Sequence, residues 1–204
     1  MLDILIPTFR RPQNLKPLHQ NLLEVTRGDF ELTLLVERSD LETVHEINRI
    51  PCRSIIGDFL TFSNAINTGY FLTQGDTFFT GMDDMVFTDG WDVEPQRILR
   101  TRSDVAAVIS IMDGIYNGCF TVRRLYVLEN SLVEGMPNLV LYPYHHHESD
   151  REMLWTLHNR GVLVKCPESV IHHQHQEDST HIKTKSMDKV DFETYWARRH
   201  LFRG

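Results

Sequence analysis

The sequence has few cysteines and no long apolar run. Its 204 residues include only Cys52, Cys119 and Cys166. An odd number of well-separated cysteines cannot form a closed disulfide framework and is typical of a reducing compartment. The longest uncharged apolar run, Val105 to Met112, is far shorter than the roughly 20 residues that span a bilayer. We therefore expect no membrane partner.

The N-terminus lacks the pattern of a secretory signal. Asp3 and Pro7 interrupt the opening residues MLDILIPTFRR, so no basic stretch is followed by an apolar core and a small-residue cleavage site. Together with the cysteine content, this pattern predicts a cytoplasmic protein.

Positive charge is also in deficit. Lys and Arg total 21 against 28 Asp and Glu, which gives a formal net charge of −7. This acidic total opposes nonspecific attraction to nucleic acid, although local basic groups remain. These groups are Arg10 with Arg11, Arg123 with Arg124, and the C-terminal Arg198, Arg199, His200 and Arg203. Composition alone therefore leaves a nucleic-acid substrate open.

Apolar runs alternate with amphipathic stretches along the chain at the spacing of βαβ units. The pattern predicts an α/β fold with a mostly parallel sheet flanked by helices, and the length indicates one domain. We expect strands over Leu2–Pro7, Leu32–Val36, Arg53–Ile56, Thr77–Met82, Val105–Ile111, Gly118–Arg123, Val162–Cys166 and Ser169–Ile171. We expect helices over Pro12–Val25, from Ser39, and over Ser63–Leu72, Val93–Leu99 and Ser149–Arg160. Ser39 with Glu42, and Ser149 with Glu152, have the spacing of capping boxes.

The strongest local signal is an apolar strand that ends in two adjacent carboxylates, Asp83 and Asp84. In an open parallel sheet, ligands bind beyond the carboxyl ends of the strands. Carboxylate oxygens suit a hard divalent cation, which in turn neutralises a pyrophosphate. The alternative is that both residues simply begin a turn, where Asp is common.

Four segments, taken in order, resemble a known family. They are Ile4–Pro12, Ser63–Gly69, Gly81–Met85 followed by Gly90-Trp91, and His173–His175. Their order and spacing are similar to those of short glycosyltransferases of the GT-A fold, family 2, and especially of the compact type encoded by tailed bacteriophages. The resemblance implies one Rossmann-like GT-A domain over residues 1–204, with a nucleotide-binding part at about 1–92 and an acceptor-side part at about 93–204.

The resemblance also implies a metal-dependent transfer of sugar from a nucleoside diphosphate sugar, with a UDP-sugar favoured, to an acceptor hydroxyl. The first acidic position of the family's Asp-x-Asp motif falls on Met82, which leaves Asp84 as the direct metal ligand. We expect a late histidine, His173 or His175, as the second ligand, because alternate residues of an extended segment point the same way. An imidazole ligand favours Mn²⁺ over Mg²⁺. The alternative is a solvated, inert histidine run.

The remaining site residues follow from the same resemblance. The expected donor-binding residues are Pro7, Thr8, Arg10, Glu37, Asp40, Asn64, Asn67 and Asp83. An inverting transfer needs a general base for the acceptor hydroxyl. We expect Asp150 in that role, with Glu148 as a substitute. The family's adjacent acidic pair is absent here, so the stereochemical outcome stays open.

The acceptor is less constrained than the donor. A hydroxymethylated base in DNA is one candidate, since the resemblance is to phage enzymes and the C-terminus is basic; the location would then be the host cytoplasm. A saccharide or protein hydroxyl is the alternative. Two rival functions remain: a nucleotidyltransferase, although Pro7 to Asn14 lacks a Gly-rich phosphate loop, and a non-enzymatic His-rich module that binds a metal or a partner.

Overall fold

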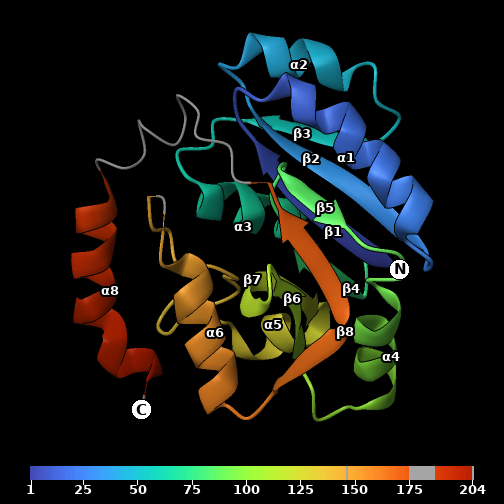
Figure 1. Ribbon diagram of the computed structural model, residues 1–204. Helices are drawn as coiled ribbons and strands as arrows, with labels where there is room; N and C mark the ends of the chain where they lie inside the picture. Colours follow the sequence, from blue (N-terminus) through green and yellow to red (C-terminus); the bar gives the residue numbers. More distant parts are fainter. Residues whose placement is uncertain (146, 175–186, 204) are drawn as a thin grey trace.

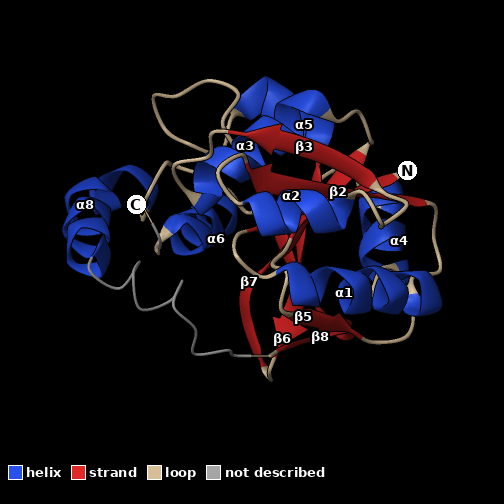
Figure 2. Cartoon of the chain, turned by 90° about the horizontal axis from the view of Figure 1, so that it is seen from above, coloured by secondary structure: helices blue, strands red, loops and turns tan. Residues whose placement is uncertain are grey.

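One eight-stranded sheet runs through the protein, with helices on both of its faces (Figures 1 and 2). The computed structural model describes residues 1–145, 147–174 and 187–203. The strands are β1 (Leu2–Thr8), β2 (Phe30–Glu37), β3 (Arg53–Gly57), β4 (Thr77–Thr80), β5 (Met85–Phe87), β6 (Ala107–Met112), β7 (Ile115–Arg123) and β8 (Leu163–His173). The helices are α1 (Pro12–Val25), α2 (Leu41–Ile47), α3 (Phe62–Leu72), α4 (Val93–Thr101), α5 (Arg124–Asn130), α6 (Ser149–Asn159) and α8 (Asp188–Phe202).

The strand order is β3-β2-β1-β4-β7-β6-β8-β5. The strands β3, β2, β1 and β4 are parallel, as are β6 and β8. Antiparallel pairing joins β4 to β7, β6 to β7 and β5 to β8. The expected α/β architecture, a mixed and mostly parallel sheet flanked by helices, is confirmed.

Alternation along β1 explains why helices cover both faces of the sheet. Ile4 and Ile6 belong to the apolar cluster that α1 and α2 complete, whereas Leu5 packs with α3 on the opposite face. Successive side chains of a strand point to opposite faces, so a strand buried on both sides reads as a continuous apolar run. Because β1, β2 and β4 are parallel, their carboxyl ends lie at the same edge of the sheet, between the two helical layers.

Three elements were not expected from the sequence: β5, α5 and α8. In addition, β8 is one continuous strand where two short ones were expected, and β4 ends at Thr80. Both capping predictions are wrong. The cap of α2 is Asp40, whose carboxylate accepts a hydrogen bond from the Thr43 amide. Glu152 is buried and pairs with Arg198 at 2.8 Å instead of capping α6.

The C-terminal arginines lie in α8 or, for Arg203, directly after it, and α8 lies beside α6 (Figure 1). Arg198 pairs with the buried Glu152, and its guanidinium lies over the Tyr142 ring at 3.6 Å. Arg199 and Arg203 stack on Trp196 and Trp155. The basic tail expected from the sequence is therefore largely engaged in contacts within the protein.

None of the helices in the described part of the chain has the length and apolar character needed to cross a membrane.

Candidate active site

Two buried carboxylates, Asp83 and Asp84, fill the turn between β4 and β5, at the carboxyl edge of the parallel strands. Both residues are less than 10% exposed, at 5% and 7%. Buried carboxylates are uncommon unless they are paired or bind a ligand. Their partners therefore define the site.

Asp83 is held by the end of β1 and by the residue that precedes α1. Its Oδ2 accepts a hydrogen bond from the Thr8 hydroxyl at 2.7 Å, and its Oδ1 accepts one from Nη1 of Arg11 at 3.1 Å. Burial raises the pKa of Asp83 to about 6, although the Thr8 hydrogen bond and the Arg11 charge act in the opposite direction. Asp83 therefore resists ionisation more than an exposed carboxyl does.

Asp84 contacts His173, which ends β8. The Nε2 atom of His173 lies 3.0 Å from Oδ1 of Asp84, and Nη1 of Arg11 lies 2.9 Å from Oδ2. Burial disfavours the charged form of Asp84, but the hydrogen bond and charge of His173, with the charge of Arg11, outweigh it and lower its pKa. The hydrogen bond to Asp84 correspondingly raises the pKa of His173.

Strand pairing fixes this Asp84–His173 contact. Met85 is paired with His173 in the antiparallel β5–β8 ladder, and the Gln174 amide donates to the Asp84 carbonyl at 2.8 Å. Two residues that are 89 positions apart in sequence are thus brought together by backbone hydrogen bonds rather than by side-chain contact alone. The sequence pointed to both residues, but the short strand β5 that aligns them was missed.

The donor atoms at this point suit a divalent cation. A carboxylate oxygen and an imidazole nitrogen converge at 3.0 Å, and mixed oxygen and nitrogen ligands are typical of Mn²⁺ or Zn²⁺ sites. Within the described residues no group of three His, Cys, Asp or Glu side chains could hold a metal. A cation held by Asp84 and His173 would therefore need further ligands from a bound substrate or from solvent. His175, the other expected ligand, lies outside the described residues.

A cleft of about 300 Å³ opens beside the acidic pair. Asp84, His173 and Arg11 line one part of it, and residues of α6 line another. The wall is completed by Phe62, Thr80, Gly81, Met82, Gly118, Phe120, Leu141, His147, Ser149, Asp150 and Met153. Asp150 therefore shares one cavity with Asp84. A side chain built at Gly118, in the left-handed conformation, would lie 3.5 Å from the Asp150 carboxylate, so this glycine leaves room beside it.

Glu148 is placed differently from Asp150. It is not among the residues that line the cleft, and its carboxylate pairs with Arg151 at 2.9 Å. Burial raises its pKa, although the Arg151 charge opposes this shift. Of the two expected bases, Asp150 has the more direct access to a bound acceptor.

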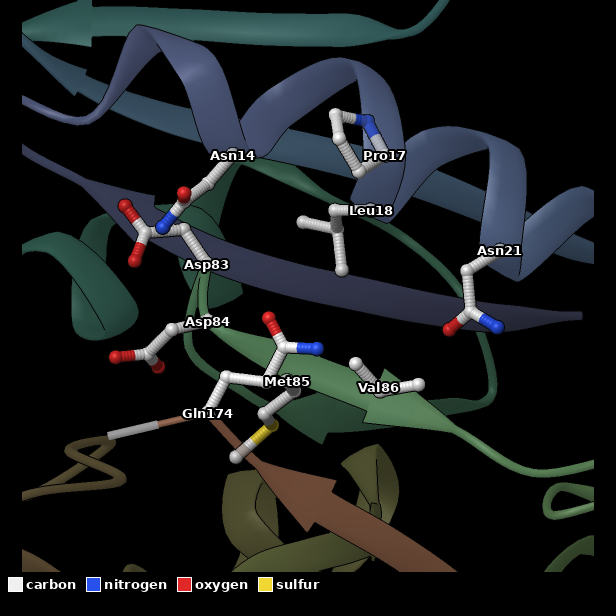
Figure 3. Close-up of a pocket in the computed structure, with 9 residues that line it drawn as sticks. All are labelled: Asn14, Pro17, Leu18, Asn21, Asp83, Asp84, Met85, Val86 and Gln174. Carbon is white, nitrogen blue, oxygen red and sulfur yellow. The ribbon is translucent and has the colours of Figure 1, made fainter. Parts of the chain in front are cut away.

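A second, smaller cavity of about 120 Å³ lies on the α1 side of the same carboxylates (Figure 3). Asp83 reaches toward the first turn of α1 beside Asn14, and Gln174 approaches from the end of β8 (Figure 3). Asp84 borders both this cavity and the larger cleft. Asp84 thus lies between the two cavities, and Asp83 borders the smaller one alone.

The other expected donor residues have several roles. The backbone amide of Arg10, at a φ of 59°, donates to Asp40, which ties the β1–α1 loop to the end of β2. Glu37, at the same end of β2, accepts from the Phe59 amide at 2.5 Å. Pro7 lies near the end of β1, and Asn64 lies in the first turn of α3.

Asn67 has a role other than the one expected. It is buried, its amide donates to the Leu141 carbonyl at 2.8 Å, and its carbonyl accepts from the amides of Val140 and Leu141. All of these contacts are to the loop that precedes α6. Asn67 therefore anchors the part of the cleft wall that contains Leu141, and it lines neither cavity.

Arg11 is the main contact that sequence reasoning did not assign. The sequence shows it only as a local basic group beside Arg10, and nothing in the local pattern indicates that it contacts the acidic pair. The side chain of Arg11 is only 15% exposed. The acidic pair itself was the available signal, since two buried carboxylates require a counter-charge nearby.

The fold matches solved structures of glycosyltransferases. Glucosyl-3-phosphoglycerate synthase from Mycobacterium tuberculosis, solved with Mn²⁺, UDP and glucosyl-3-phosphoglycerate, superposes with a TM-score of 0.74 at 12% identity, over 97% of this chain and 79% of that one. The same synthase with Mg²⁺ and UDP gives 0.72 at 12% identity, over 97% and 79% of the two chains. A further mycobacterial protein gives 0.64 at 10% identity, over 86% and 68%. The expected GT-A architecture is confirmed.

The sequence itself matches no protein-family model and no curated protein.

Proposed function

We propose that this protein is a metal-dependent glycosyltransferase that moves a sugar from a nucleoside diphosphate sugar, UDP-sugar favoured, to an acceptor hydroxyl. One observation carries the proposal: the Asp84–His173 pair at the sheet edge shares a cleft of about 300 Å³ with Asp150. Glucosyl-3-phosphoglycerate synthase, which has the same fold, has been solved with Mn²⁺ and UDP-glucose. That similarity supports the donor class.

On this proposal the nucleotide part of the donor lies along the ends of β1 and β2. Pro7, Thr8, Arg10, Glu37 and Asp40 border that region, with Asn64 at the start of α3 and Asp83 beside Thr8. Asp84 and His173 would hold a divalent ion, Mn²⁺ or Mg²⁺. When bound, the ion supplies positive charge to the departing diphosphate.

Asp150 would act as the general base. Its carboxylate accepts the proton of the acceptor hydroxyl while that oxygen attacks the anomeric carbon and the diphosphate leaves. Asp150 and Asp84 line the same cleft, which supports this assignment. Glu148 is the substitute, although its ion pair with Arg151 must first be broken.

For the acceptor we propose a small hydroxyl compound such as a saccharide. A hydroxymethylated base in DNA, the acceptor suggested by the phage-like segments, loses support because Arg198 pairs with Glu152 and the neighbouring arginines stack on tryptophans. An oligonucleotide with hydroxymethylated bases and a panel of free sugars, offered with the same labelled donor, separate the two acceptors.

The decisive experiment measures nucleotide binding by thermal shift. UDP, GDP, dTDP and CDP are each added with and without Mn²⁺ to the wild type, to Asp84→Ala and to the surface control Asp104→Ala. At a hundredfold excess over Kd, a ligand stabilises by about 2.7 kcal/mol, or roughly 5–10 °C for a domain of this size. We expect that shift with UDP and Mn²⁺ in the wild type and the control, and its loss in Asp84→Ala.

Absence of a shift with every nucleotide would contradict the proposal and favour the His-rich binding module. The four nucleoside triphosphates are added in a parallel series, and a shift with these alone would favour a nucleotidyltransferase. Asp150→Asn separates binding from chemistry, because it should keep the UDP shift and lose sugar transfer.

A further inference from the structure

Arg11 bridges the two acidic residues through a single nitrogen. Its Nη1 lies 3.1 Å from Oδ1 of Asp83 and 2.9 Å from Oδ2 of Asp84. The arginine side chain is 15% exposed, and the carboxylate side chains are 4% and 5% exposed. This is a largely desolvated contact, in which charge interactions are stronger than at the surface.

The bridge places a positive charge where a bound cation would be. A divalent ion coordinated by an Asp84 oxygen lies about 2.0–2.2 Å from it. The guanidinium nitrogen is already 2.9 Å from the other oxygen of that carboxylate. Because like charges repel strongly at such separations in a buried site, the guanidinium and the ion cannot both hold these oxygens.

We propose that Arg11 is an internal counter-cation, which neutralises the Asp83–Asp84 pair in the metal-free protein and exchanges with the divalent ion. The inference rests on the proposed function, since it concerns the same metal position. Two buried carboxylates without a counter-charge would destabilise the fold, and Arg11 removes that penalty until the ion arrives. Arg11 also lines the large cleft, so its guanidinium has space to move into. The affinity for the metal ion is therefore reduced by the free energy needed to displace the Arg11 guanidinium.

The test is a titration of the nucleotide-free protein with Mn²⁺. The electron paramagnetic resonance signal of free Mn²⁺ measures how much of the ion is bound. Arg11→Gln removes the competing charge, so we expect binding about tenfold tighter or more, which corresponds to about 1.4 kcal/mol. Arg11→Lys keeps the charge and should stay within a few-fold of the wild type. Arg102→Gln is the matched control, because it also removes one positive charge but lies at an exposed ion pair with Asp104 and lines neither cavity. It should leave Mn²⁺ affinity unchanged at physiological ionic strength.

Melting temperatures give a second readout. In EDTA, Arg11→Gln should melt several degrees below the wild type, because Asp83 loses its charged partner and Asp84 keeps only His173. In saturating Mn²⁺ the difference should close, because the ion takes over that role. Arg11→Met, which keeps the apolar stem, serves the same comparison if the glutamine variant does not fold in EDTA.

The outcomes separate the two proposals. If the wild type binds Mn²⁺ through Asp84 but Arg11→Gln binds no more tightly, the exchange is wrong and the proposed function stands. If the melting temperatures of the wild type and Arg11→Gln differ by the same amount in EDTA and in Mn²⁺, the exchange is also wrong. Arg11 would then stabilise the fold whether or not the ion is bound. If neither the wild type nor the Arg11 variants bind Mn²⁺ without nucleotide, the exchange is wrong, and the thermal shift with UDP and Mn²⁺ decides the proposed function separately.

Discussion

The strands β1 and β4 carry a buried Arg–carboxylate cluster at each end, and the two clusters differ in what surrounds them. At the amino edge of the sheet, Arg124 pairs with Asp3 at 2.7 Å. At the carboxyl edge, Arg11 pairs with Asp83 and Asp84. The residue types are the same, and so is the degree of burial: the arginine side chains are 12% and 15% exposed.

The Arg124 cluster is enclosed by protein. The guanidinium donates to the Gly75 carbonyl at 2.6 Å and to the Thr73 hydroxyl at 2.8 Å, and it also contacts the Tyr70 carbonyl. Its flat face lies over the Tyr70 and Phe78 rings at 4.8 and 5.5 Å. The carboxylates at the other edge instead border two cavities. Similar arginine–carboxylate pairs are thus enclosed by protein at one edge of the sheet and border cavities at the other.

The largest effect that tests this contrast is the loss of activity in Asp84→Ala. We expect sugar transfer to fall by about 1,000-fold or more, or ~4 kcal/mol, because the donor diphosphate loses its charge stabilisation. The fold should persist, since Arg11 still has Asp83 as a partner. Steady-state kinetics with a UDP-sugar and circular dichroism measure the two properties. An active, folded Asp84→Ala protein would show that the carboxylates at the carboxyl edge are not needed for sugar transfer.

The converse variant is Arg124→Met, which should affect stability alone. Asp3 would be left buried without its counter-charge, and breaking a buried pair in this way typically costs about 3–5 kcal/mol. Urea unfolding in the presence of EDTA measures the loss, while Mn²⁺ binding to the folded fraction should match the wild type. Arg102→Met, at an exposed ion pair with Asp104, is the control and should not change the unfolding midpoint. Weakened Mn²⁺ binding in Arg124→Met would show that the two edges are coupled.

The sequence predicts most of the amino-terminal half of the fold. The helix α1 has the bounds expected from its apolar spacing, and β1, β2, β3 and α3 differ by one or two residues at their ends. These elements are long or strongly periodic, so local pattern suffices. In contrast, β5 has three residues and exists only because it pairs with β8. A segment that depends on a distant partner leaves no periodic signal.

The same limit applies to side chains at the site. Acidic residues after an apolar strand, and a histidine after a later one, pointed to Asp84 and His173, because residue type and position at a strand end are local features. The partners of Asn67 and Glu152 are not local: their hydrogen bonds reach 74 and 46 residues along the chain. Glu152 has the spacing of a helix cap, but it is buried because its carboxylate accepts hydrogen bonds from Arg198 and from the Tyr144 hydroxyl.

The third test uses pH to measure how much the buried, ionised Asp83 destabilises the carboxyl edge of the sheet. The buried Asp83 has a pKa of about 6, against 3.8 for an ordinary carboxyl. Between these values the unfolded chain has lost its proton and the folded chain keeps it, so the stability of the metal-free protein falls as pH rises through this window. Asp83→Asn removes the effect. We expect it to be more stable than the wild type by about 2 kcal/mol at pH 8, with a smaller difference at pH 4.

Urea unfolding of metal-free protein from pH 4 to 8 measures this difference. Asp89→Asn changes the net charge equally at the exposed pair with Arg27, so it controls for overall charge. If the free energies of unfolding of the wild type and Asp83→Asn differ by the same amount at every pH, burial does not raise the pKa of Asp83.

The smallest expected effect concerns the hydroxyl that supports Asp83. Thr8→Val removes the 2.7 Å hydrogen bond to Oδ2 of Asp83 with little change in shape. We expect the free energy of unfolding to fall by about 1 kcal/mol at pH 8. The loss should be smaller at pH 4, because a charged carboxylate accepts the stronger hydrogen bond. Thr33→Val is the matched control on β2. Its hydroxyl is buried and has no hydrogen-bond partner within the described residues, so the change should be neutral or stabilising. Equal effects of the two substitutions would show that Thr8 contributes through packing rather than by holding a carboxylate ready for a ligand.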